Sequence, residues 1–133
     1  MKRLAFSTVL ALPALLLNSC SEPSKAAPQP GTIPPPAEVA NVTFETHIKP
    51  IFESACFKCH GAEKQKAGLR LDSRDATVHG GENGPLFETG RSEESSLIRC
   101  IARVGDENDW MPPIDKGKPL SLEQGALVRA WID

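Results

Sequence analysis

The stretch "SACFKCHG", residues 54–61, decides how the rest of the sequence is interpreted. Cys56 and Cys59 are separated by two residues, and His60 follows the second cysteine directly. Thiols and an imidazole at this spacing have three familiar uses. They attach a c-type haem, they form half of a structural zinc site, or the two thiols form a redox-active disulfide. The remainder of the sequence decides among these three.

The composition points to one small domain with a thin core. A chain of 133 residues suggests a single domain, and the net charge of −2 gives no reason to expect a nucleic-acid partner. Aromatic residues make up only 5% of the chain, there are 12 prolines, and much of the apolar content lies in the first twenty residues. A domain of this kind usually requires a cross-link or a cofactor for stability.

The first twenty residues, "MKRLAFSTVLALPALLLNSC", have the pattern of an export signal. Lys2 and Arg3 precede an apolar run that is too short to span a membrane as a helix. The run ends at "LNSC", which resembles the lipobox of bacterial lipoproteins, although Asn18 is unusual there. We therefore expect a lipoprotein signal peptide over residues 1–19 and lipidation of Cys20. The alternative is ordinary signal cleavage beside an incidental cysteine.

A spacer follows the signal. Residues 20–41 are rich in Pro and Ala and have no apolar periodicity, which predicts an extended, unpacked tether between a lipid anchor and a domain. The folded domain is expected over residues 42–133.

Within that domain the sequence predicts a mostly α fold of three short helices and long loops. Apolar residues at helical spacing predict a helix at about 48–57, with Pro50 tolerated in its first turn. A second helix is expected at 93–103, capped by Ser92, and a third is expected to begin at Ser121, where Gln124 completes a capping box. The region from Gly61 to about Arg91 is expected to be irregular, and no alternating run predicts a strand.

This context favours haem for the "CFKCH" motif. Thioethers from Cys56 and Cys59 would hold one covalent haem c, and His60 would be the proximal iron ligand. A zinc site would require a second pair of ligands, and no second C-x-x-C exists. A thioredoxin-like thiol pair would require a βαβ context, which the sequence does not offer. Export agrees with haem, because bacteria attach c-type haem outside the cytoplasm.

The sixth iron position has several candidates. Met111 lies in "DWMPPI", where two prolines stiffen the chain after a soft thioether, and it is the preferred distal ligand. The alternative is that Met111 only covers the core. His79 lies in a glycine-rich loop and is a weaker candidate. His47 is too close in sequence to the proximal side to cross the haem plane.

From about Phe44 to Asp133 the chain resembles the planctomycete-type cytochrome c domain. The resemblance rests on motifs in this order: "PIFESACFKCHG", "KQKAGLRLDS", "GGENGP", "SSLI", "WMPP", "LS" and "WID". It implies a class I-like α fold with Cys56 and Cys59 bonded to haem, His60 proximal and Met111 distal. Thr89 stands where the family often has proline, and Cys100 is not part of the pattern. The family motif usually continues past "WID", where this sequence stops.

Three functional classes fit these expectations. The first is a membrane-tethered carrier of single electrons in the periplasmic space, which is not an enzyme and which meets redox protein partners. The second is a haem sensor or peroxidase with a displaceable sixth ligand, for which Arg70 or His79 would be the distal polar group. The third is an accessory haem domain of a larger complex. Ser21 suggests the outer rather than the inner membrane, and Lys64 and Lys66 could line a docking face.

Four further residues are expected to have structural roles only. Cys100 is expected to be a small buried residue, and Trp131 is expected to pack the last helix on the first. Glu93 and Glu94 are expected to start a solvated helix.

Overall fold

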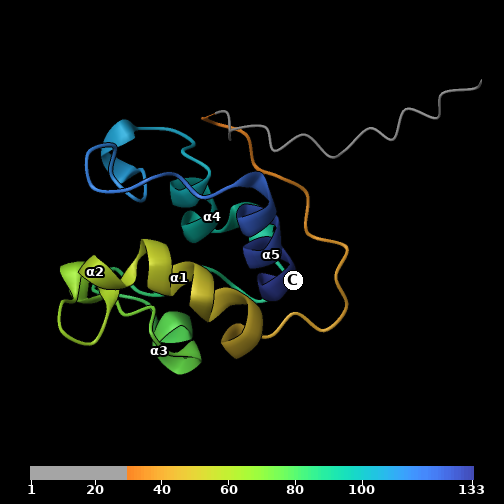
Figure 1. Cartoon of the computed structure of the whole chain (residues 1–133), viewed down its shortest axis with the longest axis horizontal. Coiled ribbons are helices and arrows are strands. Elements are labelled where there is room, and N and C mark those ends of the chain that lie inside the picture. Colours follow the sequence, from red (N-terminus) through yellow and green to blue (C-terminus); the bar gives the residue numbers. More distant parts are fainter. Residues whose placement is uncertain (1–29) are drawn as a thin grey trace, which may run out of the picture.

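The computed structural model describes residues 30–133, and in this range it is helical with long loops (Figure 1). The α-helices are α1 (Lys49–Ala55), α2 (Phe57–His60), α3 (Arg74–His79), α4 (Ser96–Ile101) and α5 (Leu122–Ile132). Within these residues there are only isolated β-bridges and no strand. The prediction of a mostly α fold is confirmed, and the prediction of three helices was too low.

The first predicted helix, at about 48–57, is divided into two pieces, α1 and α2, and a looser turn precedes it as expected. A π-helical turn, Phe44–Ile48, leads into α1, and Pro50 occupies the first turn of α1 as expected. Cys56 then ends α1, because its φ of −121° leaves the helical range, and α2 begins one residue later. The apolar positions predicted for this helix do form the core, since Phe44, Ile48, Ile51 and Phe52 are buried.

Helix α5 packs against the start of the domain. Its N-terminus carries the predicted capping box, in which Ser121 and Gln124 bond each other's backbone amides. The indole of Trp131 lies with its centroid 5.5 Å from that of Phe44 and 5.2 Å from that of Phe87. Trp131 therefore packs the last helix on the π-helical turn that leads into α1 and on Phe87, not on α1 itself.

The second predicted helix is shorter than expected and has a different cap. Ser95, not Ser92, caps α4 by accepting a hydrogen bond from the amide of Ile98. Ser92 begins a separate 3-10 turn, Ser92–Glu94, and an extended Ser95 separates that turn from α4. The predicted apolar stripe was Leu97, Ile98, Ile101 and Val104. The first three are buried on α4, whereas Val104 is half-buried and lies beyond the end of the helix. The helical bounds 93–103 were wrong because Ser92 and Ser95 both precede the apolar stripe and compete as caps. Ser92 is instead bound by Asp133, and Ser95 caps the helix.

The region expected to be irregular contains α3, which the sequence analysis missed. This helix has six residues, too few for an apolar stripe, and Ser73 caps it by accepting from the Ala76 amide. The rest of the region is pinned by backbone bonds, including Glu82 N to Ala67 O at 2.9 Å. At its turn, Gly80 has a φ of +85° and a Cβ there would lie 2.1 Å from the carbonyl oxygen of Gly84. Only glycine fits that position.

Residues 31–37 do not behave as the predicted tether. They run along α5 (Figure 1), where Ala37 N donates to Ala126 O at 2.9 Å and Arg129 Nη1 donates to Pro34 O at 2.7 Å. Gly31 N donates to Ala102 O at 3.0 Å, and Pro34 is buried. The expectation of unpacked chain through residue 41 is wrong for this segment, because its proline carbonyls offer unused acceptors to a buried arginine.

The predicted signal peptide and the lipidation site Cys20 lie outside the described residues. Among residues 30–133, no helix has both the length and the apolarity needed to cross a bilayer.

Candidate haem site

The motif residues are gathered in one helical turn. Cys56 closes α1 by donating its amide to Phe52 O at 2.7 Å. Its own carbonyl then accepts from the amides of Cys59 at 3.0 Å and His60 at 2.9 Å. The three side chains that would bind a haem therefore leave one short, hydrogen-bonded segment, with Cys56 buried and the other two half-buried.

The chain must turn sharply after His60, and Gly61 allows this. A Cβ at Gly61 would lie 2.6 Å from the carbonyl oxygen of Phe57, so any side chain there would displace α2. Beyond the turn, Leu71 N donates to His60 O at 2.8 Å and ties the "GLRLDS" segment to the motif. The backbone of His60 is thus fixed from both sides.

The electrostatics of the motif favour neutral ligands. Burial lowers the pKa of His60, so its imidazole is uncharged at neutral pH, and its buried Nδ1 has no hydrogen-bond partner. Burial, together with the neighbouring Cys59, raises the pKa of the Cys56 thiol to about 12. A neutral imidazole with an unused ring nitrogen is the form that binds metals. The two thiols are free of disulfide bonds.

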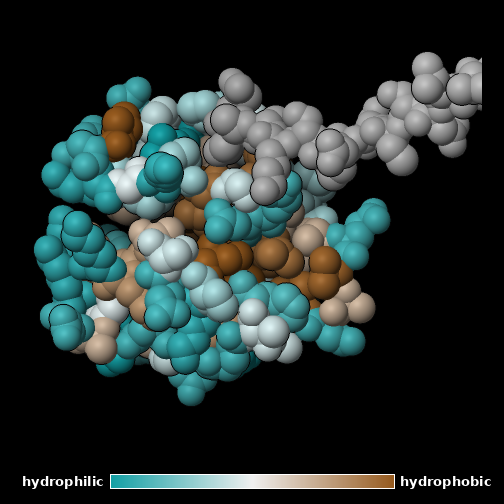
Figure 2. All heavy atoms as spheres, in the orientation of Figure 1, coloured by the Kyte–Doolittle hydropathy of each residue, from teal (hydrophilic) through white to brown (hydrophobic). Residues whose placement is uncertain are grey.

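The loop that carries Met111 faces the motif across a hollow. Figure 2 shows this hollow in the surface between the loop of residues 102–120 and the segment around α2. On the loop side, Lys116 Nζ donates a hydrogen bond to Asp115 Oδ2 at 2.6 Å, and this bond raises the pKa of Lys116. The pKa of Asp115 is lowered mainly by its hydrogen bond to Lys116, and Lys66 contributes.

The main chain of Met111 is anchored to α4. Its amide donates to the carbonyl of Cys100 at 3.0 Å, and the next residue, Pro112, is buried. Cys100 was expected to be a buried small residue; it is half-buried, and burial raises the pKa of its thiol, so it stays protonated.

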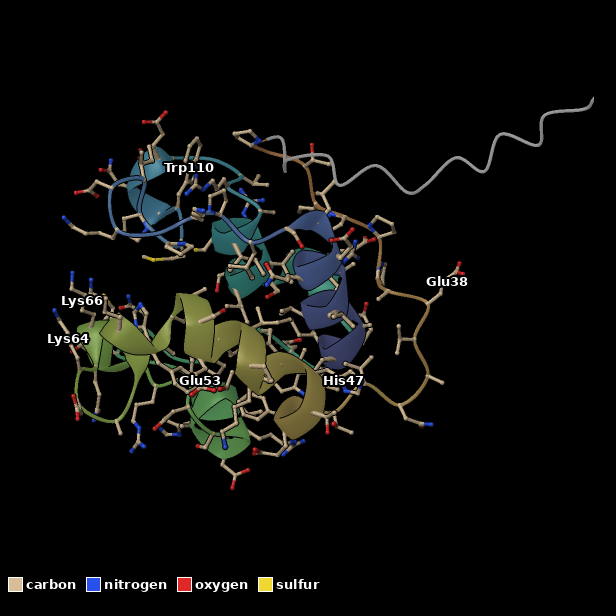
Figure 3. The ribbon with its side chains drawn as sticks, viewed as in Figure 1. Glu38, His47, Glu53, Lys64, Lys66 and Trp110 are labelled. Carbon is tan, nitrogen blue, oxygen red and sulfur yellow. The ribbon has the colours of Figure 1, made fainter. Side chains whose placement is uncertain are left out.

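The two other histidines are held elsewhere. His47 lies at the far end of α1 from α2 (Figure 3), where its Nδ1 accepts from the amide of Thr43 at 3.1 Å. His79 is exposed in the last turn of α3, and Figure 1 shows α3 on the opposite side of α1 from the 102–120 loop. Of the sixth-ligand candidates, only Met111 is on the loop that faces the motif.

Arg70, the other predicted distal polar residue, is already paired. Its Nε and Nη2 donate to the two carboxylate oxygens of Asp72 at 3.0 and 2.7 Å. Lys64 and Lys66 are exposed at the edge of the molecule beside α2 (Figure 3).

Two residues that the sequence analysis did not select brace the Met111 loop. Arg103 Nη2 donates to Pro112 O at 3.1 Å, and its guanidinium carbon lies 5.6 Å from the ring centroid of Trp110. Trp110 stands on the loop that overhangs α2 (Figure 3). The indole directly before "MPP" was the available signal; no periodicity marks Arg103.

The side chains present fit a covalent haem. Two free thiols and a neutral imidazole with an unpartnered nitrogen belong to the turn on one side of the hollow, and a thioether is on the opposite loop. A zinc site has less support, because across residues 30–133 no three His, Cys, Asp or Glu side chains gather as a metal cluster.

Comparison with known proteins agrees with this chemistry. A family model described as Planctomycete cytochrome C matches residues 56–115, from the first motif cysteine to just beyond Met111. No curated protein and no solved structure matches the chain. The match covers both sides of the hollow and the loops between them. The match supports a planctomycete-type cytochrome c domain at residues 56–115, and Cys56 and Cys59 lie within it.

Proposed function

We propose that this protein is a mono-haem c-type cytochrome that carries single electrons. The observation that supports this most directly is the opposition of two braced elements, the Cys56–His60 turn and the Met111 loop, across one hollow. A bound haem supplies an iron that alternates between the ferric and ferrous states.

Each residue has a role in holding that group. Cys56 and Cys59 would form the thioether bonds to haem, and His60 would be one ligand of its iron. Met111 would be the second ligand, on a chain segment stiffened by Pro112 and Pro113. Two protein ligands that scarcely move suit electron transfer, because the electron then crosses with little rearrangement.

A sensor or peroxidase is the competing function, and it would need an open or displaceable sixth position with polar groups beside it. Arg70 is paired with Asp72 and His79 is on the far side of α1, so neither supports that function. An accessory role in a larger complex would use the same site in the same way.

We further propose that the protein is exported and tethered to the periplasmic side of a bacterial membrane. The outer membrane is proposed because Ser21 follows the lipidated cysteine, by analogy with bacterial lipoproteins. The support is the sequence pattern of residues 1–20 and the need to attach c-type haem outside the cytoplasm. Its partners would then be redox proteins that reach the edge beside Lys64 and Lys66. Mass spectrometry of the membrane fraction should find acyl chains on the wild type and none on Cys20→Ser.

The test of the carrier function is ligand access to the iron. Ferric wild type should show the weak near-infrared band of a sulfur–iron bond, and Met111→Ala should lack it and have a reduction potential lower by more than about 100 mV. Reduced wild type should bind carbon monoxide slowly or not at all, and the oxidised form should show negligible peroxidase turnover.

Rapid carbon monoxide binding by the wild type, equal to that of Met111→Ala, would instead establish an open site. The function would then be that of a sensor or peroxidase. Cys100→Ser is the matched control, because it removes the other sulfur near the Met111 loop without touching the proposed ligand.

A further inference from the structure

Arg103 occupies a backbone position that usually belongs to glycine. It follows the C-terminal end of α4 with a φ of +57°, and the bonds Arg103 N to Cys100 O (3.2 Å) and Val104 N to Arg99 O (2.9 Å) close the helix. This pair of bonds is the Schellman arrangement, in which the left-handed residue is most often glycine because a Cβ is strained there. A strained backbone position is kept where other contacts of the residue compensate for it, and at Arg103 these contacts come from the side chain.

That side chain contacts the residues on both sides of Met111. Arg103 Nη2 donates to Pro112 O at 3.1 Å, and the guanidinium lies over Trp110, with 5.6 Å between its central carbon and the ring centroid. Trp110 is itself fixed, because its Nε1 donates to Gly105 O at 3.3 Å. The guanidinium therefore spans the segment that presents the thioether.

The backbone reinforces the same link. The carbonyl of Cys100 accepts from the amide of Arg103 and also from the amide of Met111. One carbonyl thus joins the strained residue to the proposed iron ligand.

Arg103 does not serve a surface ion pair. Among the described residues no carboxylate lies within 4 Å of its guanidinium, and its Nε is buried without a hydrogen-bond partner. Elsewhere in the domain arginines are paired with acids, as Arg70 is with Asp72. The contacts of Arg103 are concentrated on the Met111 loop.

We propose that Arg103 is a positioning residue that keeps the Met111 thioether on the iron. It acts through Pro112 and Trp110, which it holds on either side of Met111. The inference rests on the proposed Met111 ligation and adds the residue that makes this ligation persistent. Without the clamp the loop opens more often, and an added ligand competes more easily for the sixth position.

The decisive variant is Arg103→Gly in the full-length holoprotein. Glycine removes the clamp and relieves the left-handed strain, so the backbone turn is retained. Imidazole should bind the ferric variant about tenfold more tightly than the wild type, as expected for loss of a charge-assisted hydrogen bond and a cation–π contact. The near-infrared sulfur–iron band should disappear at correspondingly lower imidazole concentrations.

Two controls separate positioning from general loosening. Arg99→Ala removes an exposed arginine from α4, one turn earlier, and should leave imidazole affinity unchanged. Arg129→Met weakens the fold at α5, and it should lower the urea midpoint of unfolding without changing imidazole affinity. Arg103→Lys, which keeps the charge but not the planar fork, should fall between wild type and Arg103→Gly.

The proposal is overturned if Arg103→Gly binds imidazole with wild-type affinity while the wild type shows the sulfur–iron band. It is also overturned if Arg129→Met tightens imidazole binding as much as Arg103→Gly does. A wild type that lacks the band and binds imidazole as Met111→Ala does would contradict the proposed Met111 ligation itself, so the two failures are distinguishable.

Discussion

Ser92 and Asp133 are joined by two hydrogen bonds, from the Ser92 amide to Oδ1 at 2.9 Å and from its hydroxyl to Oδ2 at 2.7 Å. The same hydroxyl accepts from Arg129 Nε at 2.9 Å. The buried Arg129 also donates a hydrogen bond from Nη1 to Pro34 O. One network therefore connects the turn before α4, helix α5 and the segment at residues 31–37. This end of the fold is therefore held together by a network of polar contacts that joins segments far apart in the sequence.

Replacing Arg129 by Met should destabilise the domain by about 2–4 kcal/mol. Methionine fills a similar volume but leaves Pro34 O and the Ser92 hydroxyl without a donor, and such losses cost this much in buried networks. Urea unfolding followed by circular dichroism measures the change. Arg99→Met, on the exposed face of α4, is the matched control and should stay within about 0.5 kcal/mol of the wild type. An Arg129→Met protein as stable as that control would show that the network contributes little.

Gly80→Ala should destabilise by at least about 2 kcal/mol, because the new Cβ meets the backbone at Gly84 in addition to the strain of a positive φ. Gly84→Ala provides the comparison. Its φ is +92° but nothing lies within 4 Å of the added carbon, so only the conformational cost of about 1 kcal/mol should appear. Equal unfolding midpoints for the two variants would mean that the turn relaxes around the clash.

Changing Cys56 and Cys59 together to Ser should abolish covalent haem attachment. The wild type should retain its haem through acid–acetone extraction and show the mass of one added haem, whereas the double variant should show neither. Cys100→Ser should behave as the wild type, since that thiol is on α4 behind the Met111 loop. Haem that extracts freely from the wild type, or zinc recovered in its place, would refute the proposed attachment.

The Arg70–Asp72 pair should give a small stabilisation that depends on pH. The hydrogen bond from Arg70 holds the pKa of Asp72 below its usual value, so the folded state keeps the carboxylate charged to lower pH than the unfolded state does. The contribution is present above the unfolded-state pKa of about 3.9 and disappears as the pH falls through the lower folded-state value. The difference in urea midpoint between wild type and Asp72→Asn should therefore be constant well above pH 3.9 and shrink as the pH falls below about 3.9. Asp75→Asn, which alters a nearly fully exposed carboxylate, should show no such trend.

The sequence predicted the position of the candidate site better than it predicted where the helices begin and end. Spacing alone selected Cys56, Cys59 and His60 as candidates for haem attachment, and the structure gathers them in one hydrogen-bonded turn. Burial of Phe44, Ile48 and Ile98 followed from periodicity. In contrast, α3 has six residues and no stripe, and the choice of Ser95 over Ser92 depends on Ser92 being taken by Asp133, 41 positions away. Contacts of that range are invisible to local patterns.

Arg103 was missed for a similar reason. A left-handed arginine after a helix has no local sequence signature, and its contacts with Trp110 and Pro112 appear only when the loop folds back. The packing of residues 31–37 on α5 also arises from a distant partner, Arg129, and composition alone describes such a segment as free spacer.

The packing of residues 31–37 on α5 also limits how far the domain could extend from a lipid anchor at Cys20. If Cys20 bears the lipid, an unpacked chain to residue 41 would have let the domain stand up to about 75 Å from its anchor, at roughly 3.5 Å per extended residue. Because Gly31 and Pro34 belong to the folded body, the available length ends near residue 30, and the limit falls to about 35 Å. A lipid anchor at Cys20 would then keep the domain within a few nanometres of the lipid headgroups, and any redox partner would have to present its own redox centre close to the membrane surface.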